Sequence, residues 1–125
     1  MNFPEDLKYT DSHEWVKVDG DVVVIGITEY AAGELGDVVF VDIPEARAVA
    51  TGDSFGSIEA VKTVSDLIAP IAGTITEINP ELEGSPETVN ADPYGDGWMV
   101  KMTADNAADI DGLMDVAQYK ALIGK

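Results

Sequence analysis

One lysine stands in the middle of an apolar run, and its position suggests a site of covalent modification. Lys62 lies within residues 56–73 (GSIEAVKTVSDLIAPIAG), between a valine and a threonine, in a chain with only seven Lys and Arg residues. A charge in such a run must be buried at a cost, paired, or placed at a turn. Strand-like segments at residues 54–61 and 63–69 favour the turn, and they predict a hairpin with Lys62 at its tip.

A lysine at the tip of a hairpin is held on a rigid support, where a modifying enzyme can reach its amine. We expect the flanking strands to bury Ile58, Val61, Val64 and Leu67, while the tip itself has no inner face. Most lysines in turns are solvated charges without a role. The spacing alone therefore leaves both interpretations of Lys62 open.

The other polar clusters fit neither a metal centre nor a catalytic triad. His13 is the only histidine, and its neighbours Ser12 and Glu14 cannot converge with it on a strand, where adjacent residues point to opposite faces. The acidic residues around Asp109 lack the glycine-punctuated spacing of a calcium loop. The chain has no cysteine, which excludes disulfides, thiolate zinc sites and thiol chemistry of the protein itself.

The strong negative charge limits the classes of partner. The chain has 24 acidic and seven basic residues, and its formal net charge is −17. Such a surface repels phosphates and anionic lipids, so we expect neither nucleic acid nor a membrane as a partner. The charge would speed encounter with basic protein surfaces, or it could form a solvated acidic shell without a specific target.

The elements that must position these residues are mostly short strands. Alternating and β-branched runs, with a turn signal at residues 19–21, predict further strands at residues 14–18, 22–28, 37–43, 74–78 and 98–102. Many short strands with regular turn signals are typical of a small sandwich or flattened barrel. The predicted fold class is therefore mostly β, a flattened barrel or sandwich.

Short helices are predicted at four places. Residues 29–35 form a helix with Thr28 as its N-cap and Gly36 as its end. Ser85 and Pro86 are predicted to open a single turn. The C-terminal third changes to helical periodicity, at residues 105–114 and then at 115–123 with Asp115 as the cap.

Length and composition favour one domain. A chain of 125 residues with 46% hydrophobic content can bury a core of its own, so we expect residues 1–125 to form a single domain. Residues 105–125 are expected to be a helical extension packed on the barrel. No apolar segment approaches a membrane span and the N-terminus lacks a targeting pattern, so a cytoplasmic location is expected, or a mitochondrial one if this is a trimmed mature form.

The surroundings of Lys62 resemble the lipoylation site of the glycine cleavage system H-protein family. The resemblance rests on Glu59-Ala60-Val61-Lys62, Ser65-Asp66, Pro70 and Gly73, and it continues from residue 7 to about residue 120. Further matching stretches are residues 12–16, 24–28, 36–41, 43–44, 79–82, 90, 92–95 and 97–101. Ala60 departs from the serine common in the family, but it is small enough not to block an attachment enzyme.

Two related carrier classes fit the sequence less well. Biotin carriers usually have methionine on both sides of their lysine, whereas Lys62 has Val61 and Thr63. Lipoyl domains of the 2-oxo acid dehydrogenases typically have aspartate directly before the lysine. The pattern therefore favours the H-protein family over both.

The resemblance implies a fold, a cofactor and specific site residues. The fold would be of the lipoyl-domain, barrel-sandwich hybrid type. Lys62 would carry lipoic acid in amide linkage, with Glu59 and Gly73 serving recognition by a lipoate-attachment enzyme. Ser12, Glu14 and Asp66 would line a cleft that shelters the loaded arm.

The resemblance also implies a function without catalysis by the chain itself. A family member would shuttle the aminomethyl group of glycine from the P protein, a pyridoxal-phosphate-dependent decarboxylase, to the T protein, an aminomethyltransferase. The L protein, a dihydrolipoyl dehydrogenase, would reoxidise the arm. The chain would thus be a carrier component of a multienzyme system and not an enzyme.

Other interpretations remain at this point. A lipoyl or octanoyl relay protein, which donates the cofactor to other complexes, can resemble the carrier closely. Ser12, Glu14 and Asp66 favour glycine cleavage, because a relay donor has no aminomethyl group to shelter. Without the resemblance, Ser12 and Asp66 are simply good turn residues and Glu14 faces solvent. An unmodified interaction module is disfavoured by the spacing around Lys62.

Overall fold

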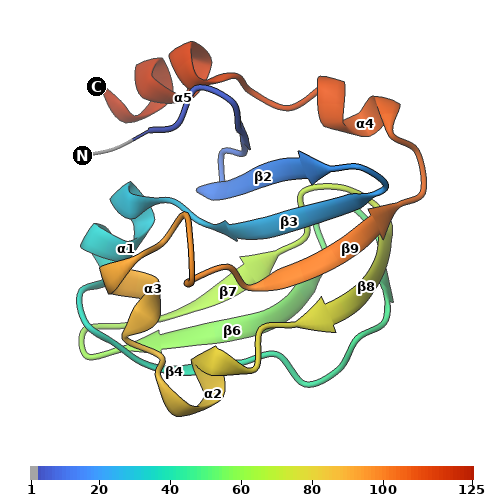
Figure 1. The fold of residues 1–125 in the computed structure, drawn as a ribbon. Coiled ribbons are helices and arrows are strands. Elements are labelled where there is room, and N and C mark those ends of the chain that lie inside the picture. Colours follow the sequence, from blue (N-terminus) through green and yellow to red (C-terminus); the bar gives the residue numbers. More distant parts are fainter. Residues whose placement is uncertain (1–2) are drawn as a thin grey trace.

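The fold is a flattened sandwich of two antiparallel sheets, seen in a computed structural model that describes residues 3–125 (Figure 1). One sheet has six strands in the order β1 (Lys8–Tyr9), β2 (Glu14–Asp19), β3 (Val22–Ile27), β9 (Val100–Ala104), β8 (Gly73–Ile78) and β5 (Ala48–Val49). The other has three, in the order β4 (Val38–Asp42), β6 (Ser54–Ala60) and β7 (Val64–Ile68). Within the described residues the sheets do not join into a closed barrel. The predicted mostly-β class is confirmed as a sandwich.

The main core lies between the two sheets. Strand alternation sends Val23, Ile25 and Ile27 of β3 into it, where they join Ile58 of β6 and Leu67 of β7. All five side chains are less than 5% exposed. The hydrophobic effect thus fixes which face of each strand points inward, and with it which residues face outward.

A second, smaller core lies on the opposite face of the six-stranded sheet. Trp15 points to this face, whereas its neighbour Val16 points into the main core. Trp15 packs with Leu7, Tyr9 and Tyr119, and its indole N–H donates to the backbone oxygen of Pro93 at 2.9 Å. The second core therefore joins the first strands to the C-terminal helix.

The helices occupy the ends and the outer face of the sandwich. They are α1 (Glu29–Leu35), α2 (Glu81–Gly84), α3 (Thr88–Ala91), α4 (Ala108–Asp111) and α5 (Val116–Ile123). The hydroxyl oxygen of Thr28 accepts from the Ala31 N–H at 3.1 Å to cap α1, and Gly36 ends it with a φ of 81°. Both ends of α1 were predicted, and both are confirmed.

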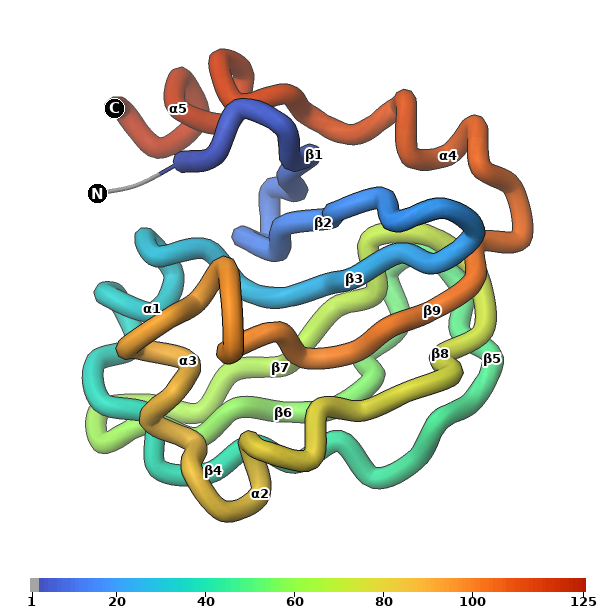
Figure 2. The backbone as a smooth tube through the Cα atoms, in the orientation of Figure 1, coloured from blue at the N-terminus to red at the C-terminus, as the bar shows by residue number. Residues whose placement is uncertain are grey.

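The C-terminal helix α5 packs beside β1, so the first strand and the last helix lie side by side (Figure 2). Its capping box is formed by Asp115 and Gln118, each of which bonds the backbone of the other. Tyr9 of β1 exchanges backbone hydrogen bonds with Met114, just before α5. The C-terminal segment is thus tied to the edge strand of the six-stranded sheet.

Several predicted elements differ from the structure. The last strand is Val100–Ala104 and not 98–102. The side-chain amide of Asn79 donates to the backbone oxygen of Trp98, and the Met99 N–H donates to the backbone oxygen of Ile25. The Ser85-Pro86 pair makes turns, and α3 begins only at Thr88. Of residues 105–114, only Ala108–Asp111 are helical. The short elements β1, β5 and α2 were not predicted.

Gly73 is needed where β8 passes close to β9. A Cβ at this position would overlap the backbone oxygen of Thr103. Gly33, in the exposed middle of α1, would meet nothing within 4 Å. Substitution by alanine therefore meets a steric barrier at Gly73 and none at Gly33, so the second position can serve as a control for the first.

We expect Gly73→Ala to destabilise the protein by about 1–3 kcal/mol, because β8 or β9 must shift. Gly33→Ala should stabilise it by roughly 0.5–1 kcal/mol through helix propensity. Urea unfolding of both variants and the wild type at one pH measures the two changes. A Gly73→Ala variant as stable as the wild type would contradict the packing role of this glycine.

Candidate functional site

Lys62 lies at the tip of the β6–β7 hairpin, as predicted. The Ala60 N–H donates to the Thr63 oxygen at 2.8 Å, and the Val61 N–H donates to the oxygen of Asp37 at 3.0 Å. The tip is thus fixed both to itself and to the segment before β4. Lys62 is exposed, and among residues 3–125 it makes no salt bridge. Its amine is available on a well-supported turn.

The side chains around the tip differ from the prediction. Ile58 and Leu67 are each 1% exposed, as expected, but Val61 is 72% and Val64 is 62% exposed. Val64 pairs with Glu59, which is also exposed, on the last rung of the hairpin. Cross-strand partners share one face of a sheet, so Val64 points outward together with Glu59, and Val61 lies in the bend before Lys62. Lys62 therefore stands among exposed apolar side chains and one carboxylate.

The predicted cleft residues do come together. A cleft of about 180 Å³ lies between the turn before β2, helix α1 and strand β7. Ser12 and Glu14 line it from the turn and β2, and Asp66 lines it from β7. Its apolar walls include Ile27, Ala31, Leu35, Ile58 and Leu67. The cleft thus combines a hydrophobic lining with oxygen-bearing side chains, to which Glu34 and Ser65 also contribute.

Glu14 is the buried member of this group and is only 2% exposed. The Thr10 hydroxyl donates to its Oε1 at 2.9 Å, and the backbone N–H of Ile68 also donates to it. In return, the Glu14 backbone N–H donates to the Thr10 hydroxyl oxygen at 3.2 Å. The carboxyl is therefore fixed in place, and the alternative of a solvent-facing Glu14 is wrong.

Burial raises the pKa of Glu14 to about 8, although the hydrogen bonds from Thr10 and Ile68 act in the opposite direction. The negative charge of Asp11 raises the same pKa by a smaller amount. At neutral pH the Glu14 carboxyl is therefore mostly protonated. A cation within about 4–6 Å would favour the ionised form, so Glu14 can lose its proton when a positive charge enters the cleft.

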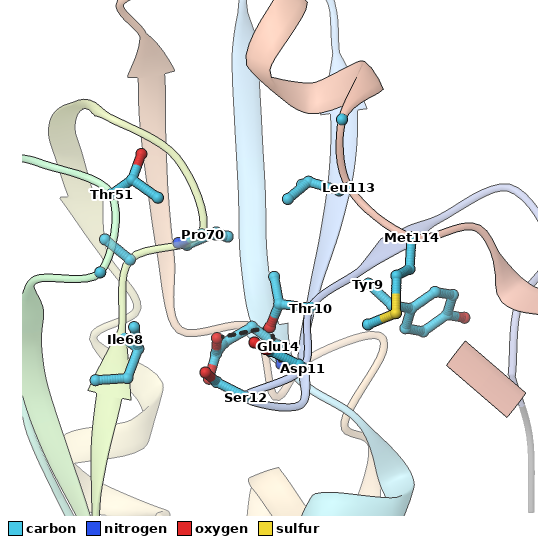
Figure 3. A pocket seen from close by; sticks show the side chains of 13 residues that line it. Tyr9, Thr10, Asp11, Ser12, Glu14, Thr51, Ile68, Pro70, Leu113 and Met114 are labelled. Carbon is cyan, nitrogen blue, oxygen red and sulfur yellow. Dashed lines mark hydrogen bonds between the residues drawn. The ribbon is translucent and has the colours of Figure 1, made fainter. Parts of the chain in front are cut away.

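A second, larger cavity of about 390 Å³ shares Ser12 and Glu14 with the cleft. Figure 3 shows it from close by, with Glu14 bonded to Thr10 at its floor. Ile68 and Pro70 stand on one side of this cavity, and Leu113 and Met114 on the other. Glu14 thus lines both the cleft and this larger cavity.

His13 connects the cleft to the C-terminal helix, which the sequence analysis did not foresee. Its Nδ1 lies 2.9 Å from the Tyr119 hydroxyl, and its ring tilts against Tyr30 at a centroid distance of 5.2 Å. Burial lowers the pKa of His13. Its φ is +70°, the one left-handed non-glycine backbone among residues 3–125. The lone histidine was the only signal in the sequence that could have drawn attention to it.

The two predicted recognition residues lie in different places. Glu59 is exposed on β6, three residues before Lys62. Gly73 is buried at the start of β8, beyond the end of β7 that lies away from the hairpin tip. The structure therefore brings Glu59 next to Lys62, but not Gly73.

Two other kinds of site find no support in the part of the chain that the structure describes. Residues 3–125 contain no group of three or more His, Cys, Asp or Glu side chains that could hold a metal ion. In the same residues no helix has the length and apolar character to cross a membrane.

Comparison with known proteins gives consistent matches over the full chain. The model of the family described as "Glycine cleavage H-protein" matches residues 7–125. The glycine cleavage system H protein of Bacteroides fragilis is 56% identical over 124 residues, covering 98% of each chain. That of Staphylococcus carnosus is 56% identical over 126 residues, covering 100% of each.

A solved structure agrees with these matches. The crystal structure of a glycine cleavage system H protein from Mycobacterium marinum superposes with a TM-score of 0.90 at 39% sequence identity. It covers 98% of this chain and 100% of the other. Both the order of the elements and their arrangement are therefore shared with that protein.

The buried Glu14 should make stability depend on pH. The unfolded chain loses this proton near pH 4.5 and the folded chain near pH 8, so between these values the folded state binds more protons. The free energy of unfolding then falls as pH rises through this window, and the loss is complete above it. Glu14→Gln removes the titration but keeps an acceptor for Thr10 and Ile68.

We expect the stability of Glu14→Gln relative to the wild type to rise by a few kcal/mol between about pH 4.5 and about pH 8. Urea unfolding across this range measures the difference, with Glu5→Gln at an exposed position as the control. A difference that does not vary with pH would show that Glu14 titrates as an ordinary carboxyl.

Proposed function

Because this chain belongs to the glycine cleavage H-protein family, we propose that it shuttles the aminomethyl group of glycine on a lipoyl group attached to Lys62. Members of this family are carrier components of the glycine cleavage system, and the chain is accordingly a lipoyl carrier and not an enzyme. The attachment site, the hand-off between partners and the role of the cleft are the proposal. The single observation that carries it is the cleft of Ser12, Glu14 and Asp66 beside an available Lys62.

The surroundings of Lys62 fit a lipoyl attachment site. The side chain is exposed and makes no salt bridge within residues 3–125, and backbone hydrogen bonds of Ala60 and Val61 hold the turn that carries it. Amide formation removes the positive charge, which suits a lysine between exposed valines. When bound, lipoic acid would supply the redox-active sulfurs that a chain without cysteine lacks.

An attachment enzyme would meet a distinctive surface at the hairpin tip. Val61 and Val64 offer apolar contact and Glu59 offers a carboxylate, all within three residues of Lys62. We infer that these side chains guide recognition directly. Gly73 would contribute indirectly, because it is buried and its close approach to Thr103 holds together β8 and β9 of the sheet that faces the hairpin.

The cleft is suited to a small organic cation on a tether. Asp66 lies four residues after Lys62, so at most about 14 Å of extended chain separates their Cα atoms. The carboxyls of Glu14 and Asp66 can pair with an ammonium, while the Ser12 hydroxyl can accept a further hydrogen bond. A charge-assisted contact of this kind is worth roughly 1.5–3 kcal/mol when it is partly buried. The apolar walls keep water from the group.

The proposed route has three partners. The chain would receive the aminomethyl group at the P protein, deliver it to the T protein, and be reoxidised by the L protein. A net charge of −17 favours basic docking surfaces on these proteins. Residues 1–125 would act as one carrier domain, in the cytoplasm in the case of a bacterial chain like those it resembles.

We expect lipoylated wild-type protein to support glycine decarboxylation by a P protein, and ammonia release when T protein and tetrahydrofolate are added. Lys62→Arg should support neither, because arginine keeps the charge but offers no acylable amine. Lys17→Arg, at an exposed position on β2, is the matched control and should behave as the wild type.

The measurements are carbon dioxide and ammonia release per carrier. A wild-type chain that is lipoylated but inert with the P protein, while it donates its lipoyl group to other carrier domains, would contradict the proposal. That outcome would make the chain a relay donor.

A further inference from the structure

The hydroxyl of Tyr119 on α5 contacts two segments that are distant in sequence. It lies 2.9 Å from Nδ1 of His13 and 2.8 Å from Oγ1 of Thr28. Tyr119 and Thr28 are both 0% exposed. The contacts span 106 and 91 residues of sequence, so the arrangement depends on the docking of the C-terminal helix.

The two contacted residues each control one wall of the cleft. His13 stands between Ser12 and Glu14, in a left-handed backbone conformation that a non-glycine residue keeps only when its surroundings hold it. Its backbone is held by the Thr10 oxygen and by the Thr28 N–H, which donates to the His13 oxygen at 3.0 Å. Its side chain is held by Tyr119.

Thr28 controls the opposite wall. Its hydroxyl oxygen accepts from the N–H of Ala31 and so caps α1, the helix that supplies Ala31 and Leu35 to the cleft. Tyr119 therefore touches the residue that shapes the turn carrying Ser12 and Glu14, and also the residue that starts α1. One hydroxyl joins both walls.

The hydrogen atoms can be assigned by requiring that each buried hydroxyl has an acceptor. If Thr28 donates to Tyr119 and Tyr119 donates to His13 Nδ1, both hydroxyl hydrogens are used and the Thr28 oxygen stays free to cap Ala31. The reverse direction leaves the Thr28 hydrogen without an acceptor among the three residues. The assignment makes His13 a neutral imidazole with its proton on Nε2.

We propose that Tyr119 and His13 are positioning residues for the cleft, which set Ser12, Glu14 and α1 at the spacing that retains the cationic group. The inference rests on the proposed function, because it concerns the same cleft. It assigns to the C-terminal helix a role beyond covering apolar surface: the Tyr119 hydroxyl links the two walls through His13 and Thr28.

Tyr9 provides a matched control for Tyr119. The two rings stack at a centroid distance of 4.8 Å with planes 10° apart, and both side chains are 0% exposed. The Tyr9 hydroxyl makes one partly buried hydrogen bond, but to the backbone oxygen of Pro4 at 2.6 Å, and Pro4 does not line the cleft. Tyr9→Phe and Tyr119→Phe therefore each lose a hydroxyl from the same cluster while the rings keep their packing.

The test is the first-order loss of the aminomethyl group from lipoylated, loaded protein, with free aminomethyl-lipoamide as the reference. We expect Tyr119→Phe to lose the group about 3- to 10-fold faster than the wild type, because the bonds to His13 and Thr28 that position the two walls are both lost. Tyr9→Phe should decay as the wild type does, and Glu14→Ala should decay fastest of the set. Equal decay of Tyr119→Phe and wild type, or equal acceleration in both tyrosine variants, would overturn the inference.

A second readout does not depend on loading. Nitrogen-15 NMR of the only histidine should show an unprotonated, hydrogen-bonded Nδ1 in the wild type and in Tyr9→Phe, and an Nδ1 that no longer accepts a hydrogen bond in Tyr119→Phe. An unchanged His13 signal in Tyr119→Phe would also overturn the inference. If the wild type decays as fast as free aminomethyl-lipoamide, the proposed cleft function fails instead, and the NMR result still decides whether Tyr119 positions His13.

Discussion

A buried carboxyl connects the two sheets of this protein, and the site is organised around it. Glu14 belongs to β2 of the six-stranded sheet, while the backbone N–H that donates to it, from Ile68, belongs to β7 of the three-stranded sheet. Thr10 holds the same carboxyl from the turn before β2. Burial of an acid is unfavourable unless its oxygens are bonded, so the two donors must stay in place. At this end of the sandwich, Glu14 thus links β2 to the turn before it and to β7.

The site separates an exposed attachment point from a sheltered cleft. Lys62 stands on a hairpin tip whose flanking valines are exposed, and Glu14 lies almost fully buried behind Asp66. An arm on Lys62 would be accessible to other proteins when extended and protected from water when folded back. Because a nearby cation stabilises the ionised form of Glu14, the sheltered state gains electrostatic stability only when the arm carries a positive charge. This selectivity suits a carrier that must release its arm once unloaded.

The sequence predicted features that depend on local chemistry and missed those that depend on tertiary contacts. Helix α1 and the Lys62 hairpin follow from Thr28, Gly36 and the β-branched runs, and both were predicted correctly. The exposure of Val61 and Val64 was not, because hydrophobicity does not reveal the register of the hairpin, which places Val64 on the outer face opposite Glu59. The link from Tyr119 to His13 joins residues 106 positions apart, and no local pattern encodes it. The meeting of Ser12, Glu14 and Asp66 was expected only from the family resemblance, and the burial of Glu14 needed the fold.

The measurement that tests this account most directly is the intact mass of the protein purified from its native host, with peptide mapping of residues 58–67. The account predicts a single lipoyl increment, located on Lys62, because this lysine alone combines a rigid turn with an exposed apolar and acidic surround beside the cleft. An unmodified Lys62 in a host that makes lipoate, or a lipoyl group on another lysine, would contradict it.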